Sequence, residues 1–194
     1  HIFDHLKLNG SLVEATSRGL RGKHNQENIC AAILASLASG ATLEGVRNAL
    51  DQYQGSDHRL EHVTTLNRIE FFNDSKATNV DAVDRALEYF QQPVVLIMGG
   101  RDKGSDFTIL QNRIQKHIKT LIVMGEAAEH IREAFRQIAI VISATSMQDA
   151  VSKAYQAAAP GDVVLLSPGC ASFDRYENYA QRGDDFRRAV YSLK

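Results

Sequence analysis

The chain has 194 residues, of which 44% are hydrophobic and 23% are charged, and its formal net charge is −1. This length and composition are typical of a globular protein with one full domain or one and a fraction. No cluster of lysine and arginine indicates a nucleic-acid surface, and no apolar run approaches the length of a membrane span, so we expect neither nucleic-acid binding nor membrane insertion.

The two cysteines indicate the redox environment of the protein, and the first residue concerns its N-terminus. Cys30 and Cys170 lie far apart in the sequence, and they predict neither a disulfide framework nor a metal site. Such sparse cysteine use is typical of a reducing cytosol. The chain begins at His1 rather than methionine, so we expect the natural N-terminus to be missing, together with any targeting signal there.

The first quarter of the chain predicts two helices with few partners. Residues 1–24 offer only a short, glycine-broken piece that could be extended. The four-residue spacing of Ile29 and Ile33 predicts a helix from about residue 25, and Thr42 is a good N-cap for a second helix that ends near residue 53. These elements cannot bury both apolar faces alone. We therefore expect residues 1–54 to be the end of a larger domain, with a linker near residues 54–57.

The remaining residues alternate regularly between strand and helix patterns. Strands are predicted at residues 60–65, 69–73, 94–98, 120–124, 138–142 and 163–166. Helices are predicted at residues 80–90, 107–117, 127–135, 147–159 and 184–193. Nearly unbroken Val/Ile/Leu strands between amphipathic helices indicate a mostly parallel six-stranded sheet covered on both faces, the Rossmann-like doubly wound α/β fold. The first two strands are predicted to form a hairpin that adds an antiparallel edge.

Polar residues follow the parallel strands, and in such a sheet they face one common cleft. The turn of residues 73–79 places Asp74, Ser75, Lys76 and Thr78 between a strand and a helix that Asn79 can cap. Backbone amides at a helix N-terminus attract anions, so this turn predicts a ligand site. An ordinary polar turn explains the same residues about as well.

The glycine-rich loop at residues 99–104 is a second candidate. Gly99 and Gly100 permit close approach of a ligand to the backbone, while Arg101 and Lys103 supply positive charge for a carboxylate or a phosphate. The order of residues differs from a Walker phosphate loop, and no strand is followed by Gly-x-Gly-x-x-Gly, which argues against a dinucleotide cofactor. A plain tight turn is the alternative.

Several other residues admit two interpretations. Asn25 and Asn28 stand three apart near a helix start, and their amides suit a purine edge, although Asn25 as a simple helix cap is favoured by the local sequence. His58 and His62 lack the carboxylate pattern of a metal site. Cys170 lies in a candidate loop, but no histidine near it in sequence activates the thiol.

These motifs occur in one order along residues 22–194. They are Lys23-His24-Asn25-x-x-Asn28, His58-Arg59, Asn73-Asp74-Ser75-Lys76-Ala77-Thr78-Asn79, Gly99-Gly100-x-Asp102-Lys103-Gly104-x-Asp106-Phe107, Leu166-Ser167-Pro168-x-Cys170-Ala171-Ser172-Phe173-Asp174 and Arg182-Gly183-x-x-Phe186. The series closely resembles the Mur ligases of bacterial peptidoglycan synthesis, specifically the branch that adds D-glutamate.

The resemblance implies a three-domain enzyme of which this chain is the C-terminal portion. Residues 1–54 would be the remnant of the central ATP-binding domain, and residues 55–194 the amino-acid-binding ligase domain. The implied enzyme is an ATP-dependent amide ligase that joins D-glutamate to UDP-N-acetylmuramoyl-L-alanine through an acyl phosphate. It would work with Mg²⁺ as a monomer in the bacterial cytoplasm. The phosphate loop and most Mg²⁺ ligands would lie outside this chain, which holds no metal ligands and is expected to be inactive alone.

The resemblance also implies roles for individual residues. Asn25 and Asn28 would line the adenine, with Arg59 and Asp74 near the nucleotide. Lys103 and Arg59 are the implied catalytic residues. The residues implied to hold D-glutamate are Thr78, Lys103, Ser172, Phe173 and Tyr179. Positively charged and hydroxyl side chains on neighbouring strand ends suit a dicarboxylate, which agrees with this assignment.

Two other interpretations remain open from the sequence. The chain could be a stand-alone doubly wound module that binds a small anion without catalysis. It could also belong to a related Mur or folylpolyglutamate ligase that uses another amino acid.

Overall fold

The computed structural model describes residues 5–8, 11–14, 23–53 and 55–193. The chain divides into two compact units, residues 1–56 and 57–194, and this division lies two residues beyond the 54/55 boundary expected from the sequence. The elements of the first unit are β1 (His5–Leu8), β2 (Ser11–Glu14), α1 (Lys23–Ala38) and α2 (Leu43–Gln52).

The first unit contains two short paired strands and two helices. Strands β1 and β2 are antiparallel. Ile29 and Ile33 of α1 and Val46 of α2 are buried against one another, as the helical spacing predicts. The Thr42 side chain accepts a hydrogen bond from the Gly45 amide at 3.1 Å, which confirms Thr42 as the N-cap of α2.

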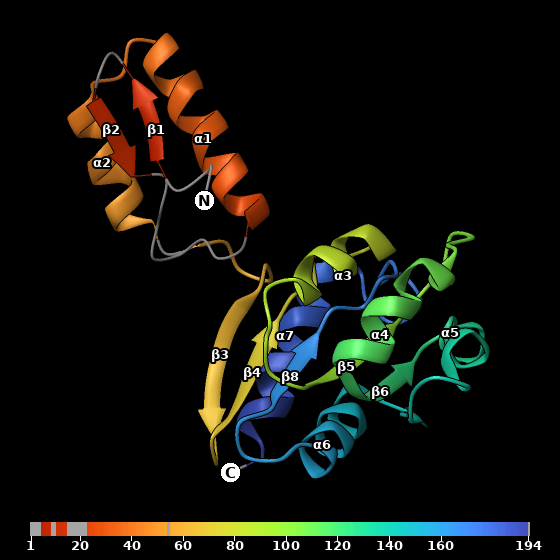
Figure 1. Cartoon of the computed structure of the whole chain (residues 1–194). Helices are drawn as coiled ribbons and strands as arrows, with labels where there is room; N and C mark the ends of the chain where they lie inside the picture. Colours follow the sequence, from red (N-terminus) through yellow and green to blue (C-terminus); the bar gives the residue numbers. More distant parts are fainter. Residues whose placement is uncertain (1–4, 9–10, 15–22, 54, 194) are drawn as a thin grey trace. The chain divides into compact units, whose positions relative to one another are not determined.

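The second unit is a six-stranded sheet in the order β3-β4-β8-β5-β6-β7 (Figure 1). Its strands are β3 (Glu61–Leu66), β4 (Ile69–Asn73), β5 (Val94–Gly99), β6 (Ile118–Met124), β7 (Val141–Ser143) and β8 (Val163–Leu166). Strands β4 to β8 are parallel to their neighbours, and β3 pairs antiparallel with β4. Asn67 and Arg68 both have positive φ at the turn between β3 and β4, as in two-residue hairpin loops. The predicted sheet and its antiparallel edge hairpin are confirmed.

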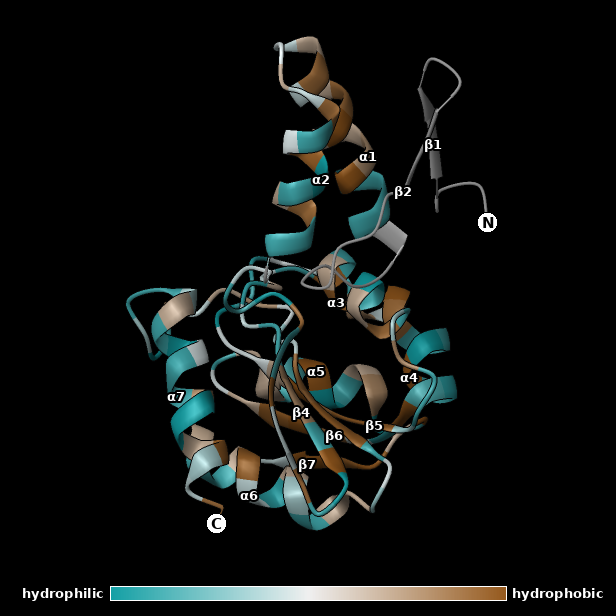
Figure 2. Ribbon diagram, turned by 90° about the vertical axis from the view of Figure 1, so that its left-hand side faces the viewer, coloured by the Kyte–Doolittle hydropathy of each residue, from teal (hydrophilic) through white to brown (hydrophobic). Residues whose placement is uncertain are grey.

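Helices cover both faces of this sheet. Their bounds are α3 (Val80–Leu87), η1 (Phe107–Leu110), α4 (Gln111–His117), α5 (Ala128–Phe135), α6 (Met147–Ala157) and α7 (Tyr179–Tyr191). Leu96 and Met98 of β5 pack into one core with α3, α4 and α5, while Val95 and Ile97 pack into the other with α6 and α7. Successive side chains of β5 thus point into opposite cores, and because both faces are buried the strand is apolar at every position. Figure 2 shows the hydrophobic strands between helices with hydrophilic outer surfaces.

Several predicted elements differ in their bounds, and three of these differences have an identifiable local cause. The last helix begins at Tyr179 rather than near residue 184, because the Asn178 side chain caps it by accepting from the Gln181 amide. The segment predicted as one helix from residue 107 begins as the 3₁₀ turn η1, whose first amides are capped by Asp106. The strand expected at residues 138–142 is confined to β7, because Ile138 instead packs at the edge of the core.

The strand order creates a switch point between β5 and β8. Strand β8 inserts between β4 and β5, and the helices that follow β5 and β8 pack on opposite faces of the sheet. In doubly wound folds, ligands bind outside the carboxyl ends of the strands at such a point.

Among the described helices, none combines the length and apolar character that crossing a bilayer requires.

Candidate functional site

Three polar segments lie at the carboxyl edge of the parallel strands and hydrogen-bond to one another. They are the β4 turn (residues 74–79), the β5 loop (residues 100–106) and the β8 loop (residues 167–178). The Gly169 amide donates to the Ala77 carbonyl at 3.0 Å, joining the β8 loop to the β4 turn. Arg101 and Ala171 exchange two backbone hydrogen bonds of 2.8 and 3.1 Å, joining the β5 and β8 loops. The three segments therefore form one connected site.

A buried polar cluster anchors the start of the β4 turn. The Asn73 side chain accepts from the Ser75 amide at 3.1 Å and donates to the Glu61 carboxylate at 3.2 Å and the Gly183 carbonyl at 3.3 Å. Its amide nitrogen also lies 3.0 Å from His58 Nδ1. His58 is 6% exposed, so its ring is packed inside this buried cluster.

Asp74 is a buried carboxyl at the centre of the turn. It accepts from the Ser167 hydroxyl at 2.9 Å and from the Leu60 amide at 3.2 Å. Burial raises the pKa of Asp74 from 3.8 to about 7, although both hydrogen bonds and the positive charge of Arg59 act in the opposite direction. Arg59 itself is exposed. The positive charge of Arg59 thus acts on Asp74, but its effect on the pKa of Asp74 is smaller than that of burial.

The second half of the β4 turn contains Lys76, which contacts α7, and Thr78, which is exposed to solvent. Thr78 is exposed and precedes Asn79, which caps α3 by accepting from the Ala82 amide at 2.9 Å. The Lys76 ammonium lies 3.8 Å from the centroid of the Tyr179 ring, a cation–π contact. The structure therefore places Tyr179, at the first turn of α7, against the β4 turn.

The β5 loop carries two cations with different environments. Arg101 forms a two-point ion pair with Glu126, with distances of 2.9 and 2.8 Å. The charge of Arg101 is therefore already paired with a carboxylate. Lys103 is exposed, and it forms no ion pair with any carboxylate in the described ranges. Asp102 shapes this loop by accepting from the amides of Lys103 at 2.8 Å and Ser105 at 3.0 Å.

The β8 loop contributes three candidate side chains with contrasting exposure. Ser172 is buried, and Phe173 is 57% exposed. Burial raises the pKa of Cys170 to about 12, so this thiol stays protonated near neutral pH and is unsuited to nucleophilic chemistry. Thr78, Lys103, Ser172, Phe173 and Tyr179 thus lie on three joined segments and the adjoining start of α7.

The two candidate adenine residues belong to the first unit. Helix α1 begins at Lys23, so Asn25 lies inside the helix, and the alternative that it caps the helix is wrong. The Asn28 amide nitrogen lies 3.5 Å from the Asn25 side-chain oxygen, so the two amides share one face of α1. Arg59 and Asp74 belong to the second unit.

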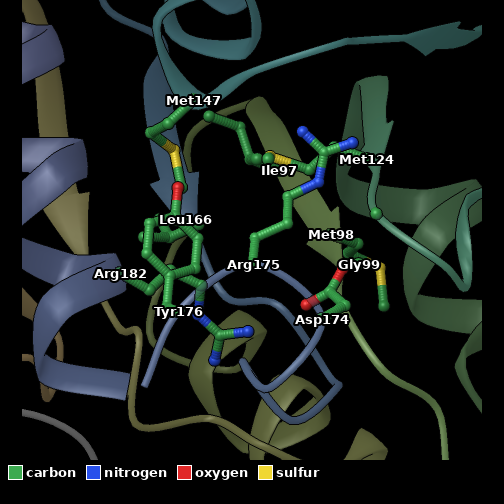
Figure 3. Close-up of a pocket in the computed structure, with 12 residues that line it drawn as sticks. Ile97, Met98, Gly99, Met124, Met147, Leu166, Asp174, Arg175, Tyr176 and Arg182 are labelled. Atoms are coloured by element: carbon green, nitrogen blue, oxygen red, sulfur yellow. The ribbon is translucent and has the colours of Figure 1, made fainter. Parts of the chain in front are cut away.

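A small hollow lies between the β5 and β8 loops. Figure 3 shows Tyr176 and Arg182 on one side of it and Asp174 and Gly99 on the other. Its volume is about 10 Å³, close to the minimum that holds one water molecule. The hollow is therefore too small to hold an amino acid.

Arg182 belongs to one of the sequence motifs, but the sequence analysis assigned no role to it. Its guanidinium is 3% exposed and contacts both the β4 turn and the β8 loop. The sequence held one usable signal, because Arg182, Phe186 and Ala189 recur at helical spacing, which places Arg182 on the buried face of α7.

The described residues include no group of three or more histidine, cysteine or acidic side chains placed to hold a metal ion. The donor set of this part of the chain therefore does not match an Mg²⁺ site.

Comparisons with known proteins relate most of the chain to one family. Residues 58–170 match the family described as Mur ligase, glutamate ligase domain. A UDP-N-acetylmuramoylalanine–D-glutamate ligase from Desulfosudis oleivorans is 52% identical over 182 residues, which cover 94% of this chain and 40% of that protein. The protein of the same name from Desulfatibacillum aliphaticivorans is 51% identical over 174 residues, which cover 90% of this chain and 39% of that protein. The chain thus spans about 40% of the length of these curated relatives.

Solved structures share the fold. The folylpolyglutamate synthase of Mycobacterium tuberculosis in complex with ADP superposes with a TM-score of 0.70 and 17% identity, and the match covers 97% of this chain and 44% of that one. At this identity the likeness establishes the fold alone.

Proposed function

This chain belongs to the Mur ligase family, and we propose that it is the C-terminal portion of an ATP-dependent amide ligase that adds D-glutamate to UDP-N-acetylmuramoyl-L-alanine in peptidoglycan synthesis. In this proposal, residues 1–54 end a central ATP-binding domain and residues 55–194 form the amino-acid-binding domain. The names of the relatives support the substrate, because they specify D-glutamate. A stand-alone anion-binding module and a ligase for another amino acid are less well supported for the same reason.

One structural observation supports the proposed amino-acid site. Three hydrogen-bonded loops at the carboxyl edge of the sheet present an ammonium from Lys103 and hydroxyls from Thr78 and Ser172. D-Glutamate has two carboxylates, which need cationic and hydroxyl donors. Phe173 directly follows Ser172, and the Tyr179 ring contacts Lys76 of the β4 turn; in this proposal the two rings would supply the apolar sides of the site. These five residues are our proposed D-glutamate contacts.

The proposed reaction has two steps. The γ-phosphate of ATP is transferred to the carboxylate of the muramoyl-alanine substrate, giving an acyl phosphate and ADP. The amine of D-glutamate then attacks the acyl carbon, and the tetrahedral intermediate expels phosphate, while the amine loses a proton as the amide forms. Within this chain, Lys103 would act by orienting the amino acid, since holding the amine against the acyl carbon accelerates the attack.

The proposed nucleotide contacts are the side chains of Asn25, Asn28, Arg59 and Asp74. We propose that Asn25 and Asn28 bind the adenine edge, because side-chain amides offer both donors and acceptors. Asp74 would accept a hydrogen bond from a nucleotide hydroxyl, and Arg59 would act as the cation near the phosphates. The complete ligase would use Mg²⁺ held mainly by residues outside this chain, and it would work as a monomer in the bacterial cytoplasm.

The isolated chain is expected to be catalytically inactive. It contains no Gly-x-x-x-x-Gly-Lys-Ser/Thr segment to orient a triphosphate, and phosphoryl transfer depends on such positioning. ATP hydrolysis and D-glutamate ligation by the purified chain should both equal the background without protein. Turnover that persists after a second purification and scales with chain concentration would contradict this.

Substitution of Lys103 tests the amino-acid site in the complete ligase. Lys103→Ala should raise the KM for D-glutamate about ten- to a hundredfold, because a charge-assisted hydrogen bond contributes roughly 1.5–3 kcal/mol. The KM for ATP should stay within twofold. Lys116→Ala, at the end of α4 on the opposite edge of the sheet, is the matched control and should change neither value.

Steady-state kinetics and a melting curve separate this result from a structural one. If Lys103→Ala lowers thermal stability but leaves the KM for D-glutamate within twofold, the β5 loop does not bind the amino acid. The same titration with other amino acids tests the substrate itself: a higher kcat/KM for another amino acid than for D-glutamate would overturn the proposed specificity.

A further inference from the structure

Arg182 is a buried positive charge that forms no close ion pair in the described part of the chain, although the negative charge of Asp174 acts on it. Its side chain is 3% exposed, and no carboxylate there forms an ion pair with it. Burial lowers the pKa of Arg182 to about 10, so the guanidinium is still charged near neutral pH. Burying such a charge is costly unless hydrogen bonds satisfy it.

Three oxygen atoms satisfy the guanidinium, and they come from two different loops. Nε donates to the Ser75 hydroxyl at 3.0 Å, and Nη2 donates to the Ser75 carbonyl at 2.8 Å. Nη1 donates to the Cys170 carbonyl at 3.0 Å. Ser75 in turn donates its hydroxyl to the Tyr179 carbonyl at 2.7 Å. A planar guanidinium can serve these acceptors together, whereas an ammonium acts as a compact point charge.

The β5 loop also packs against this guanidinium. A Cβ added to Gly100 would lie 3.1 Å from Nη1 of Arg182, so the backbone of this loop approaches the cation closely. Arg182 therefore touches or abuts the β4 turn, the β5 loop and the β8 loop. Its own helix supplies the fourth segment of the site.

The groups in contact with Arg182 lie close in sequence to the proposed D-glutamate contacts. Thr78 follows Ser75 by three residues, and Ser172 follows Cys170 by two. Lys103 follows Gly100 by three residues, and Tyr179 precedes Arg182 by three. A shift of the guanidinium would thus be transmitted to each of these side chains.

We propose that Arg182 is the positioning residue of the amino-acid site, whose guanidinium sets the spacing of the β4 turn, the β5 loop and the β8 loop. The inference rests on the proposed function, because it concerns how the D-glutamate contacts are held. A misplacement of about 1 Å in such contacts can cost about a hundredfold in rate.

The test compares Arg182→Met and Arg182→Lys with wild type in the complete ligase. Arg182→Met should raise the KM for D-glutamate at least tenfold while the KM for ATP stays within twofold. Arg182→Lys should give an intermediate rise, because it keeps the charge but loses the planar fork. Arg188→Met is the matched control, since Arg188 lies on the same helix, is exposed, and pairs only with Asp185 among the described residues; it should leave both KM values unchanged.

Each outcome decides the inference. If Arg182→Met lowers the melting temperature but has the wild-type KM for D-glutamate below that temperature, Arg182 is merely structural and the inference fails. If Arg182→Met does not fold, Arg182→Lys and Ser75→Ala carry the test, and an unchanged KM for D-glutamate in both overturns it. Failure of the wild-type enzyme to use D-glutamate would instead overturn the proposed function, before any variant is compared.

Discussion

Gly99→Ala is expected to lower the free energy of unfolding of residues 57–194 by at least about 3 kcal/mol. Gly99 has a φ of +126° at the end of β5, and a Cβ there would overlap the carbonyl oxygen of Met124 on β6 and lie 2.9 Å from its carbonyl carbon. This neighbour is backbone within a parallel ladder, so it cannot rotate away as a side chain can. Alanine would therefore have to separate β5 from β6 where the site begins.

Gly104→Ala provides the matched control. Gly104 lies in the β5 loop with a φ of +84°, and a Cβ there would meet no atom within 4 Å. Its substitution carries only the backbone strain of a left-handed conformation, about 1 kcal/mol. We expect the melting temperature to fall by about 3 °C for Gly104→Ala and by about 10 °C for Gly99→Ala.

Near-ultraviolet circular dichroism can follow this unfolding, because five of the six tyrosines lie beyond residue 56. Equal shifts for the two alanine variants would mean that the approach of Gly99 to β6 is not a constraint on stability.

The elements of the second unit were predictable because their signals are local. The runs at Val94–Gly99 and Val163–Leu166 are apolar on both faces. This pattern is typical of a strand whose sheet is covered by helices on both sides. The placement of β8 between β4 and β5 has no such signal, since it depends on which strands pair across long stretches of chain. The sheet was therefore predicted without its strand order.

The start of α7 was missed because its first turns lack the usual pattern. Gly183 is an unfavourable residue inside a helix. It is required there by tertiary packing, since a Cβ on it would overlap the His58 ring. Contacts between residues so distant in sequence override local helix propensity, and a single sequence gives no sign of them.

The candidate site shows the same division between local and distant information. The strand-end positions of Thr78, Lys103 and Ser172 followed from the pattern of strands. The pairing of Arg101 with Glu126 did not, because the two residues follow different strands and meet only once β5 and β6 are aligned. Sequence thus indicated which residues gather at the edge, while the structure distinguishes the paired cation from the unpaired one.

The buried carboxyl of Asp74 should make the stability of this chain fall as pH rises. Burial raises its pKa to about 7 in the folded protein, against 3.8 for an exposed carboxyl. Between these values the folded chain binds a proton that the unfolded chain has released, so protonation favours folding. The contribution is fully present below pH 4 and is lost as the pH rises through about 7. From pH 5 to pH 8 the loss should be on the order of 2 kcal/mol.

Asp74→Asn isolates this contribution, since every other group titrates in both proteins. Urea unfolding at pH 5, 6, 7 and 8 should show wild type losing stability relative to Asp74→Asn at each step, with the steepest change between pH 5 and 7. The side-chain oxygen of asparagine can still accept one of the two hydrogen bonds from Ser167 and Leu60. If losing the other hydrogen bond lowers the free energy of unfolding of Asp74→Asn, it does so equally at every pH, so the dependence of the difference on pH is unchanged. A difference that is independent of pH would show that Asp74 titrates as an exposed carboxyl does, and a difference of opposite slope would show that the charge of Arg59 outweighs burial.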